Sequence, residues 1–152
     1  MKKIRVAALI MAVVMLGMCM AACGGSNKVR VNCSVSVIIN GEELFGPYSL
    51  QVEGTTENPP TVLQAAREAF TVCEVPFEVD DNGYSFTTIT IDGTAYAKGS
   101  DEENIYTWYY TADDVEPESG RAGTNPVTEG QHIKFIYSAT PINPQEFSDG
   151  NN

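Results

Sequence analysis

The chain has 152 residues, a formal net charge of −11, four cysteines and one histidine. This length is enough for one domain with its own hydrophobic core and short for two. The acidic balance disfavours binding to nucleic acid or to anionic membrane polymers, so no nucleic-acid partner is expected.

Residues 1–22 are expected to form an export signal, because a basic start is followed by an apolar run over 6–18. That run is shorter than the roughly 20 residues that a spanning helix needs. Two alanines directly before Cys23 resemble the lipobox of bacterial lipoproteins, which implies a lipid on Cys23. Cleavage near Ala22 without lipid is the alternative, and Cys19 is a poorer candidate because a bulky methionine precedes it. The expected location is the extracytoplasmic face of a bacterial membrane, with residues 23–28 as a lipid-anchored tether.

The following segment, residues 29–138, is expected to be one α+β domain with a mostly antiparallel sheet and one covering helix. Alternation of apolar and polar residues predicts strands over 29–39, around 48–52, and over 84–91, 105–111 and 127–137. Thr61 and Gln64 form a capping-box pattern at the start of the helix. The apolar stripe of this helix consists of Leu63, Ala66, Phe70 and Cys73. Residues 139–152 lack periodicity and are expected to be a flexible tail.

Two cysteines remain inside the expected domain, Cys33 on the first strand and Cys73 at the end of the helical stripe. Export permits disulfides, and both cysteines are expected on apolar faces that meet. We therefore predict a Cys33–Cys73 disulfide. The alternative is two buried free thiols that pack as small hydrophobic side chains.

Four patches resemble the transcobalamin C-terminal-like domains of unknown function that occur in bacterial surface proteins. They are Thr61-Val-Leu-Gln-Ala-Ala66, Thr90-Ile-Asp-Gly93, the strand 106–111 with Trp108 and Tyr110, and the strand 127–137. The chain departs from the family at Thr111-Ala-Asp-Asp114, where Val-Asn-Gly is usual. The resemblance implies a β-grasp-like sheet crossed by one helix. In the cobalamin carriers this domain closes over a corrinoid held largely by a separate helical domain, so corrinoid binding is one alternative function.

Catalysis is not expected. The single histidine, His132, shares the exposed face of Lys134 on its strand, and the sequence lacks a nucleophile elbow, a phosphate loop and a zinc pattern. Asp113, Asp114, Glu116 and Glu118 crowd one loop, but their spacing lacks the pattern of a calcium loop. A solvated acidic loop is the simpler interpretation, so neither a metal nor a cofactor is expected.

The aromatic strand and the long loop after it are the expected contact surface. Alternation places Trp108, Tyr110, Phe135 and Tyr137 in the core and Tyr109 on the opposite face. An exposed tyrosine offers both apolar area and a hydroxyl group, and loops of this length are often functional. We predict a non-catalytic binding module for a small molecule or a cell-surface protein. Disorder of the loop and a structural component without a ligand are the alternatives. The expected binding residues are Tyr109, Asp113, Asp114, Arg121 and Asn125.

Overall fold

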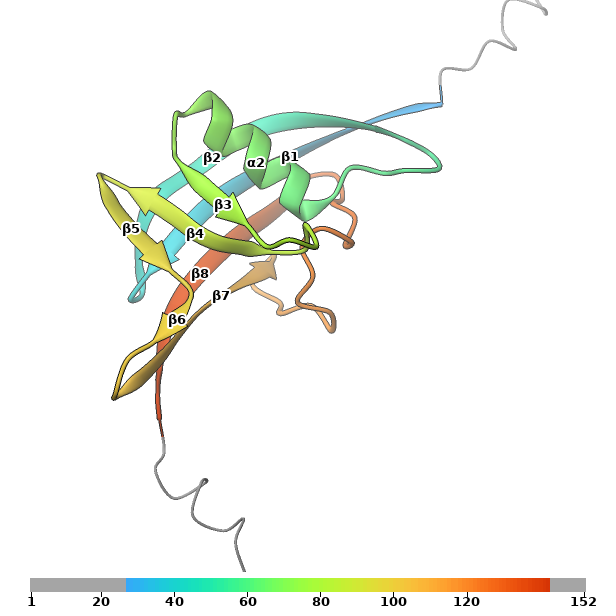
Figure 1. Ribbon diagram of the computed structural model, residues 1–152. Coiled ribbons are helices and arrows are strands. Elements are labelled where there is room, and N and C mark those ends of the chain that lie inside the picture. The colour runs from blue at the N-terminus through green and yellow to red at the C-terminus, as the bar shows by residue number, and fades with distance from the viewer. Residues whose placement is uncertain (1–26, 143–152) are drawn as a thin grey trace, which may run out of the picture.

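The computed structural model describes residues 27–142, which form two β-sheets and one helix (Figure 1). The elements are β1 (Lys28–Ile39), β2 (Glu42–Thr55), α2 (Val62–Val72), β3 (Phe77–Val79), β4 (Phe86–Ile91), β5 (Thr94–Ala97), β6 (Gly99–Ser100), β7 (Asn104–Ala112) and β8 (Gln131–Pro141). The expected signal, the lipid attachment at Cys23 and residues 143–152 lie outside the described residues. Within residues 27–142, no helix combines the length and the apolar character needed to cross a membrane.

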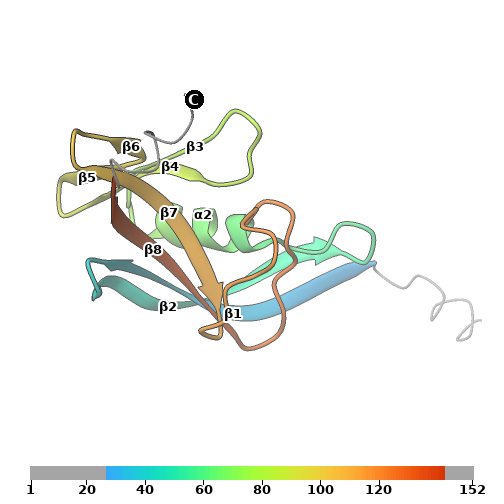
Figure 2. The same cartoon turned by 90° about the horizontal axis from the view of Figure 1, so that it is seen from below.

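The larger sheet has five strands in the order β2-β1-β8-β7-β6, and the smaller has the order β3-β4-β5. All strand pairs are antiparallel except β1 and β8, which run parallel at the centre of the larger sheet. The helix and the smaller sheet lie on the same face of the larger sheet, and the opposite, uncovered face carries no helix or strand of residues 27–142 (Figures 1 and 2). The expected α+β class, mostly antiparallel with one helix among the described residues, is confirmed.

The helix begins where the sequence predicts. Thr61 has an extended backbone and its hydroxyl oxygen accepts a hydrogen bond from Gln64 N at 3.2 Å. The reciprocal half of the capping box is not made, because the Gln64 side chain donates to Glu53 O and to Glu68 instead. Leu63, Ala66 and Phe70 face the sheet as expected, and they are buried.

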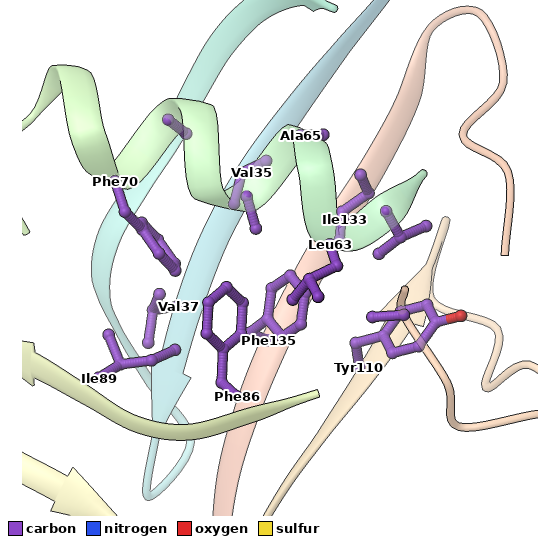
Figure 3. Packing of buried hydrophobic residues seen from close by; sticks show 14 of the residues in the cluster. Val35, Val37, Leu63, Ala65, Phe70, Phe86, Ile89, Tyr110, Ile133 and Phe135 are labelled. Carbon is purple, nitrogen blue, oxygen red and sulfur yellow. The ribbon is translucent and has the colours of Figure 1, made fainter. Parts of the chain in front are cut away.

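A chain of phenylalanine rings joins the layers of the core (Figure 3). Phe70 of the helix contacts Phe86 of β4 with ring centroids 5.3 Å apart, and Phe86 contacts Phe135 of β8 edge-on at 5.0 Å. The helix, the smaller sheet and the larger sheet therefore share one core. Trp108 and Tyr110 of β7 and Phe135 are buried, while Tyr137 is half-buried against Trp108.

The predicted Cys33–Cys73 disulfide is not formed: Cys33 is a buried free cysteine and Cys73 an exposed one. Phe70 at the end of the helix contacts Phe45, which pairs with Val37 in the sheet. The helix end therefore lies beside Val37, four residues and roughly 13 Å along β1 from Cys33. Cys73 caps the helix and is exposed, so the stripe on the buried face ends at Phe70.

Three short strands escape the sequence analysis, namely β3, β5 and β6, with three, four and two residues. The second predicted strand is longer than expected and runs over Glu42–Thr55. The last strand begins at Gln131, later than expected, and reaches Pro141, so the first three residues of the predicted tail belong to it.

Candidate binding site on the loop side of the aromatic strand

A tight turn of two aspartates ends β7. Asp113 and Asp114 have φ values of 51° and 65°, and Ala112 and Val115 exchange both backbone hydrogen bonds around them. Positive φ at both central residues defines a type I′ turn, for which Asn-Gly is the preferred sequence. Asp-Asp therefore makes the same kind of turn that the Asn-Gly of the resembled family favours.

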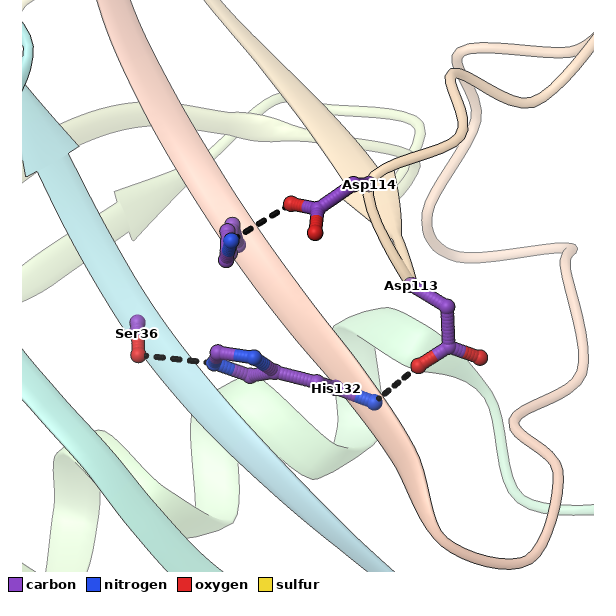
Figure 4. A network of polar contacts seen from close by, with 5 residues as sticks. Ser36, Asp113, Asp114 and His132 are labelled. Carbon is purple, nitrogen blue, oxygen red and sulfur yellow. Dashed lines mark hydrogen bonds and ion pairs between the residues drawn. The ribbon is translucent and has the colours of Figure 1, made fainter.

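Each aspartate of this turn is held by β8 (Figure 4). Asp113 accepts a hydrogen bond from His132 N at 2.9 Å and donates its own N–H to His132 O at 2.8 Å. Asp114 forms an ion pair with Lys134, which lowers the pKa of the Asp114 carboxyl group through the hydrogen bond first and the charge second. The two carboxylates that sequence analysis assigned to binding thus fasten the turn to β8.

His132 is half-buried, and its Nε2 lies 3.0 Å from the hydroxyl of Ser36 on β1 (Figure 4). Ser36 is fully buried, and a Cβ added to Gly46 would lie 2.9 Å from its Oγ, so β2 covers the hydroxyl. Asp113 contacts the backbone of His132 and not its ring. The geometry is therefore that of a structural serine–histidine pair, with the serine inaccessible to a substrate.

Tyr109 lies on the uncovered face of the larger sheet and is half-buried. It stands opposite Ile136 on β8, and Ile136 stands opposite Ile38 on β1. These three residues form a row across three neighbouring strands. The turn residues Asp113 and Asp114 lie at the end of the strand that carries Tyr109.

The loop between β7 and β8 has two parts that differ in packing. Residues 113–120 form a mostly exposed arm, whereas residues 121–127 form a packed segment in which Ala122 and Val127 are buried. Ala122 O accepts from Leu63 N at 2.9 Å and Asn125 O accepts from Val62 N at 3.0 Å. The packed segment therefore satisfies the first N–H groups of the helix, which have no partner within the helix itself.

The packed segment is also fixed to the turn before β4. Gly123 N donates to Tyr84 O at 3.0 Å, and the Arg121 guanidinium lies 5.0 Å from the centre of the Tyr84 ring. Of the two interpretations of the loop, the shaped excursion describes this segment and the alternative of disorder does not. Arg121, an expected binding residue, is engaged with a ring of its own chain.

A hollow of about 360 Å³ opens between the arm, the packed segment and the start of the helix. Its apolar walls come from Val62, Ala112, Pro117 and Pro126, and its polar lining from Tyr110, Glu118, Ser119, Asn125 and Gln131. Asn125 Nδ2 donates to the hydroxyl oxygen of Tyr110 and, at 2.7 Å, to Ser119 O. Burial raises the pKa of Tyr110, so the hydroxyl keeps its proton.

The expected binding residues thus separate into three places. Asn125 lines the hollow, Arg121 contacts Tyr84, and Tyr109 lies across the sheet from the hollow, with Asp113 and Asp114 bound to β8. Sequence reasoning missed Tyr110 and Gln131 as lining residues. The choice of tyrosine over phenylalanine at a core position of an aromatic strand was the available signal, since a buried hydroxyl needs a partner.

A larger hollow of about 590 Å³ runs along the outer side of the helix, beside Phe77 of β3. Arg67 and Thr71 in its wall are exposed, and Gln64 bonds to Glu68. We favour the smaller hollow because its floor holds a hydroxyl on a residue that is only 2% exposed. Among residues 27–142, no three His, Cys, Asp or Glu residues are grouped so as to hold a metal ion.

No family model matches this sequence, and no curated protein matches it. Among solved structures, the fold is similar to that of haptocorrin in complex with Cbi, with a TM-score of 0.51 and 19% identity. The similarity covers 73% of this chain and 25% of the haptocorrin chain. A putative metal binding protein from Ruminococcus gnavus ATCC 29149 is 17% identical over 72% of this chain and 98% of its own, with a TM-score of 0.41. The described residues thus have a transcobalamin-like fold.

Proposed function

We propose that this protein is a non-catalytic binding module that takes a small molecule in the hollow beside Tyr110. The observation that carries the proposal is a buried tyrosine hydroxyl, hydrogen-bonded to Asn125, at the floor of an open hollow. Ligand sites are commonly concave and apolar with a few convergent polar groups. The aromatic strand and its loop, which sequence analysis selected, both contribute to this hollow. The β-grasp-like description is part of the proposal, supported by the parallel β1–β8 pair beneath one crossing helix.

The proposed location is the extracytoplasmic face of a bacterial membrane, with a lipid on Cys23. Its support is the order of basic start, short apolar run and small residues before Cys23. Mass spectrometry of the mature N-terminus tests it: we expect a diacylated or triacylated Cys23. An unmodified N-terminus would contradict the lipid anchor and leave the binding proposal standing.

A contact with a cell-surface protein is the second candidate, favoured by the row of Tyr109, Ile136 and Ile38 on the uncovered sheet face. Tyrosine and isoleucine side chains of this kind form the apolar centre of many protein interfaces. A corrinoid is a further candidate, supported by the likeness in fold to haptocorrin solved with Cbi. This chain spans about a quarter of the length of haptocorrin.

Thermal-shift screening with a metabolite library, including cobinamide, tests the first proposal. Ala112 lines the hollow, so Ala112→Leu is designed to fill it, while Tyr109→Ala alters the opposite face. A ligand at a hundred times its Kd stabilises the fold by about 2.7 kcal/mol. We expect stabilisation of the wild type that Ala112→Leu loses. The site would lie elsewhere if a ligand stabilised Ala112→Leu as much as the wild type. The same would follow if Tyr109→Ala alone lost the stabilisation.

A further inference from the structure

We infer that the hollow beside Tyr110 recognises a carboxamide group on a neutral ligand. This inference rests on the proposed binding function and adds the chemical class of the ligand. It follows from which hydrogen-bonding groups of the hollow are already used within the protein and which remain free.

The orientation of the Asn125 amide is fixed by its neighbours. Its nitrogen donates to Ser119 O at 2.7 Å, and a carbonyl oxygen can only accept. The same nitrogen donates to the hydroxyl oxygen of Tyr110. The reversed amide would place two oxygens against each other, so the assignment stands. Asn125 Oδ1 has no hydrogen-bond donor among residues 27–142, so it can accept from a ligand.

The Tyr110 hydroxyl has a proton to give. Its oxygen accepts from Asn125, which is its hydrogen-bond partner among the described residues. A hydroxyl that accepts through its oxygen can still donate one hydrogen bond. The residue is only 2% exposed and lines the hollow, so this hydrogen is offered to whatever occupies the hollow. The O–H group can therefore donate to an acceptor on a ligand in the hollow.

Gln131 supplies the third group. Its Oε1 accepts from Thr128 N at 3.2 Å, which leaves the two N–H bonds of Nε2 available. The lining thus offers donors on Tyr110 and Gln131 and an acceptor on Asn125. A carboxamide matches this set, since its oxygen accepts and its nitrogen donates.

The charge around the hollow favours a neutral carboxamide over a carboxylate or an ammonium group. Glu118 lines the hollow, Glu116 lies on the same arm, and the chain is strongly acidic, so a carboxylate would be repelled. An ammonium group would be attracted by Glu118, but it would leave the Tyr110 and Gln131 donors without an acceptor. The apolar walls, Val62, Ala112, Pro117 and Pro126, suit an aliphatic chain attached to the amide.

The test compares butyramide, butyrate and butylamine, which share one aliphatic chain, by ¹⁵N–¹H spectra of the protein. We expect butyramide to shift the side-chain amide signals of Asn125 and Gln131 with a Kd in the millimolar range. We expect butyrate and butylamine to leave these signals in place. Equal binding of either compound, or no shift with butyramide at its solubility limit, would overturn the inference.

Two variants complete the test. Tyr110→Phe removes the hydroxyl and keeps the ring, and we expect it to weaken butyramide binding at least about tenfold. Tyr48→Phe removes a hydroxyl from β2, away from the hollow, and should leave binding unchanged. Thermal melts of both variants check that they fold, and Ala112→Leu gives the same loss by filling the hollow if Tyr110→Phe does not fold. Unchanged affinity in folded Tyr110→Phe would contradict the inference.

Failure of this inference and failure of the proposed function give different results. Suppose that library ligands without a carboxamide bind the wild type and lose their binding in Ala112→Leu. The hollow would then still be the binding site, but the carboxamide inference would be wrong. Ligands that bind Ala112→Leu as well as the wild type would overturn the site itself.

Discussion

Gly123 lies directly against Gly83, so that a Cβ on Gly123 would come within 2.1 Å of the Gly83 carbonyl oxygen. This contact joins the loop after β7 to the turn before β4. The same segment supplies carbonyl groups to the first N–H groups of α2 through Ala122 and Asn125. The absence of a side chain at Gly123 thus lets the loop, the turn and the helix start pack together.

Gly123→Ala should destabilise the fold by about 2 kcal/mol or more, because the clash is with backbone and must displace the loop or the turn. Urea unfolding followed by circular dichroism measures the loss. Gly120→Ala is the matched control, since a Cβ there meets nothing within 4 Å and should change stability by less than about 0.5 kcal/mol. Equal stability of the two variants would show that the loop docks differently.

The ion pair between Asp114 and Lys134 predicts a specific pH dependence. Because the folded pKa of Asp114 lies below its ordinary value of 3.8, its contribution to stability is present above that value and is lost as pH falls through the folded pKa. Asp114→Asn should therefore be less stable than the wild type at neutral pH, and the difference should vanish in acid.

The pair is exposed at Asp114, so the difference should also shrink in high salt. Urea titrations of both proteins from pH 7 down to about pH 2, at low and high salt, give the comparison. A gap between the curves that persists at the acid end would assign the effect to the turn conformation instead of the charge.

The two cysteines of the domain should differ sharply in reactivity. Burial, with smaller effects of Glu68 and Glu129, raises the pKa of Cys33 to about 11, whereas Cys73 is exposed. At pH 8 only about one Cys33 in a thousand is a thiolate, the reactive form. Iodoacetamide should alkylate Cys73 first, as read by peptide mass mapping, with Cys33 modified only after unfolding. A peptide pair linked through Cys33 and Cys73 would refute the free-thiol assignment.

Trp108→Phe should destabilise the fold by about 1–3 kcal/mol. Trp108 Nε1 donates to Tyr96 O at 2.9 Å, and the hydroxyl of Tyr137 donates to Ala97 O at 2.8 Å, so both side chains tie β5 to the larger sheet. In Trp108→Phe, amide hydrogen exchange should be faster in β5 than in β1, because β5 has lost one of the bonds that hold it to the larger sheet. Tyr137→Phe removes the more exposed hydrogen bond and should destabilise the fold less than Trp108→Phe does. A larger loss of stability in Tyr137→Phe would show that the Tyr137 bond matters more.

Alternation in the sequence is sufficient to find the long strands, because a face such as Val31, Cys33, Val35, Val37 and Ile39 of β1 is apolar and buried, although it shortens β2 to its second half. It fails for β3, β5 and β6, which are too short to show a period. The helix start is readable at Thr61, since the capping residue acts on its own neighbours. The carbonyl groups of Ala122 and Asn125 that complete the cap come from distant sequence, so no local pattern reveals them.

The candidate site shows the same limit. Asn125 and Tyr109 were expected to belong to one contact surface, but the side chain of Asn125 bonds to Tyr110, on the other face of β7. Alternation assigned Tyr110 to the core, which is correct for its ring. The position of its hydroxyl at the edge of that core depends on how the loop folds back, which strand periodicity does not describe.

The parallel pairing of β1 and β8 sets the order in which this protein can reach its native state. Cys33 pairs with Gln131 and Ile39 with Tyr137, so the centre of the larger sheet joins the two ends of the domain. Pairings so distant in sequence carry a large loop-closure cost and slow folding. During synthesis the central sheet has to wait for β8, and until then β1 has only β2 beside it. A chain interrupted before residue 131 would lack the central strand that joins the β1–β2 hairpin to β7.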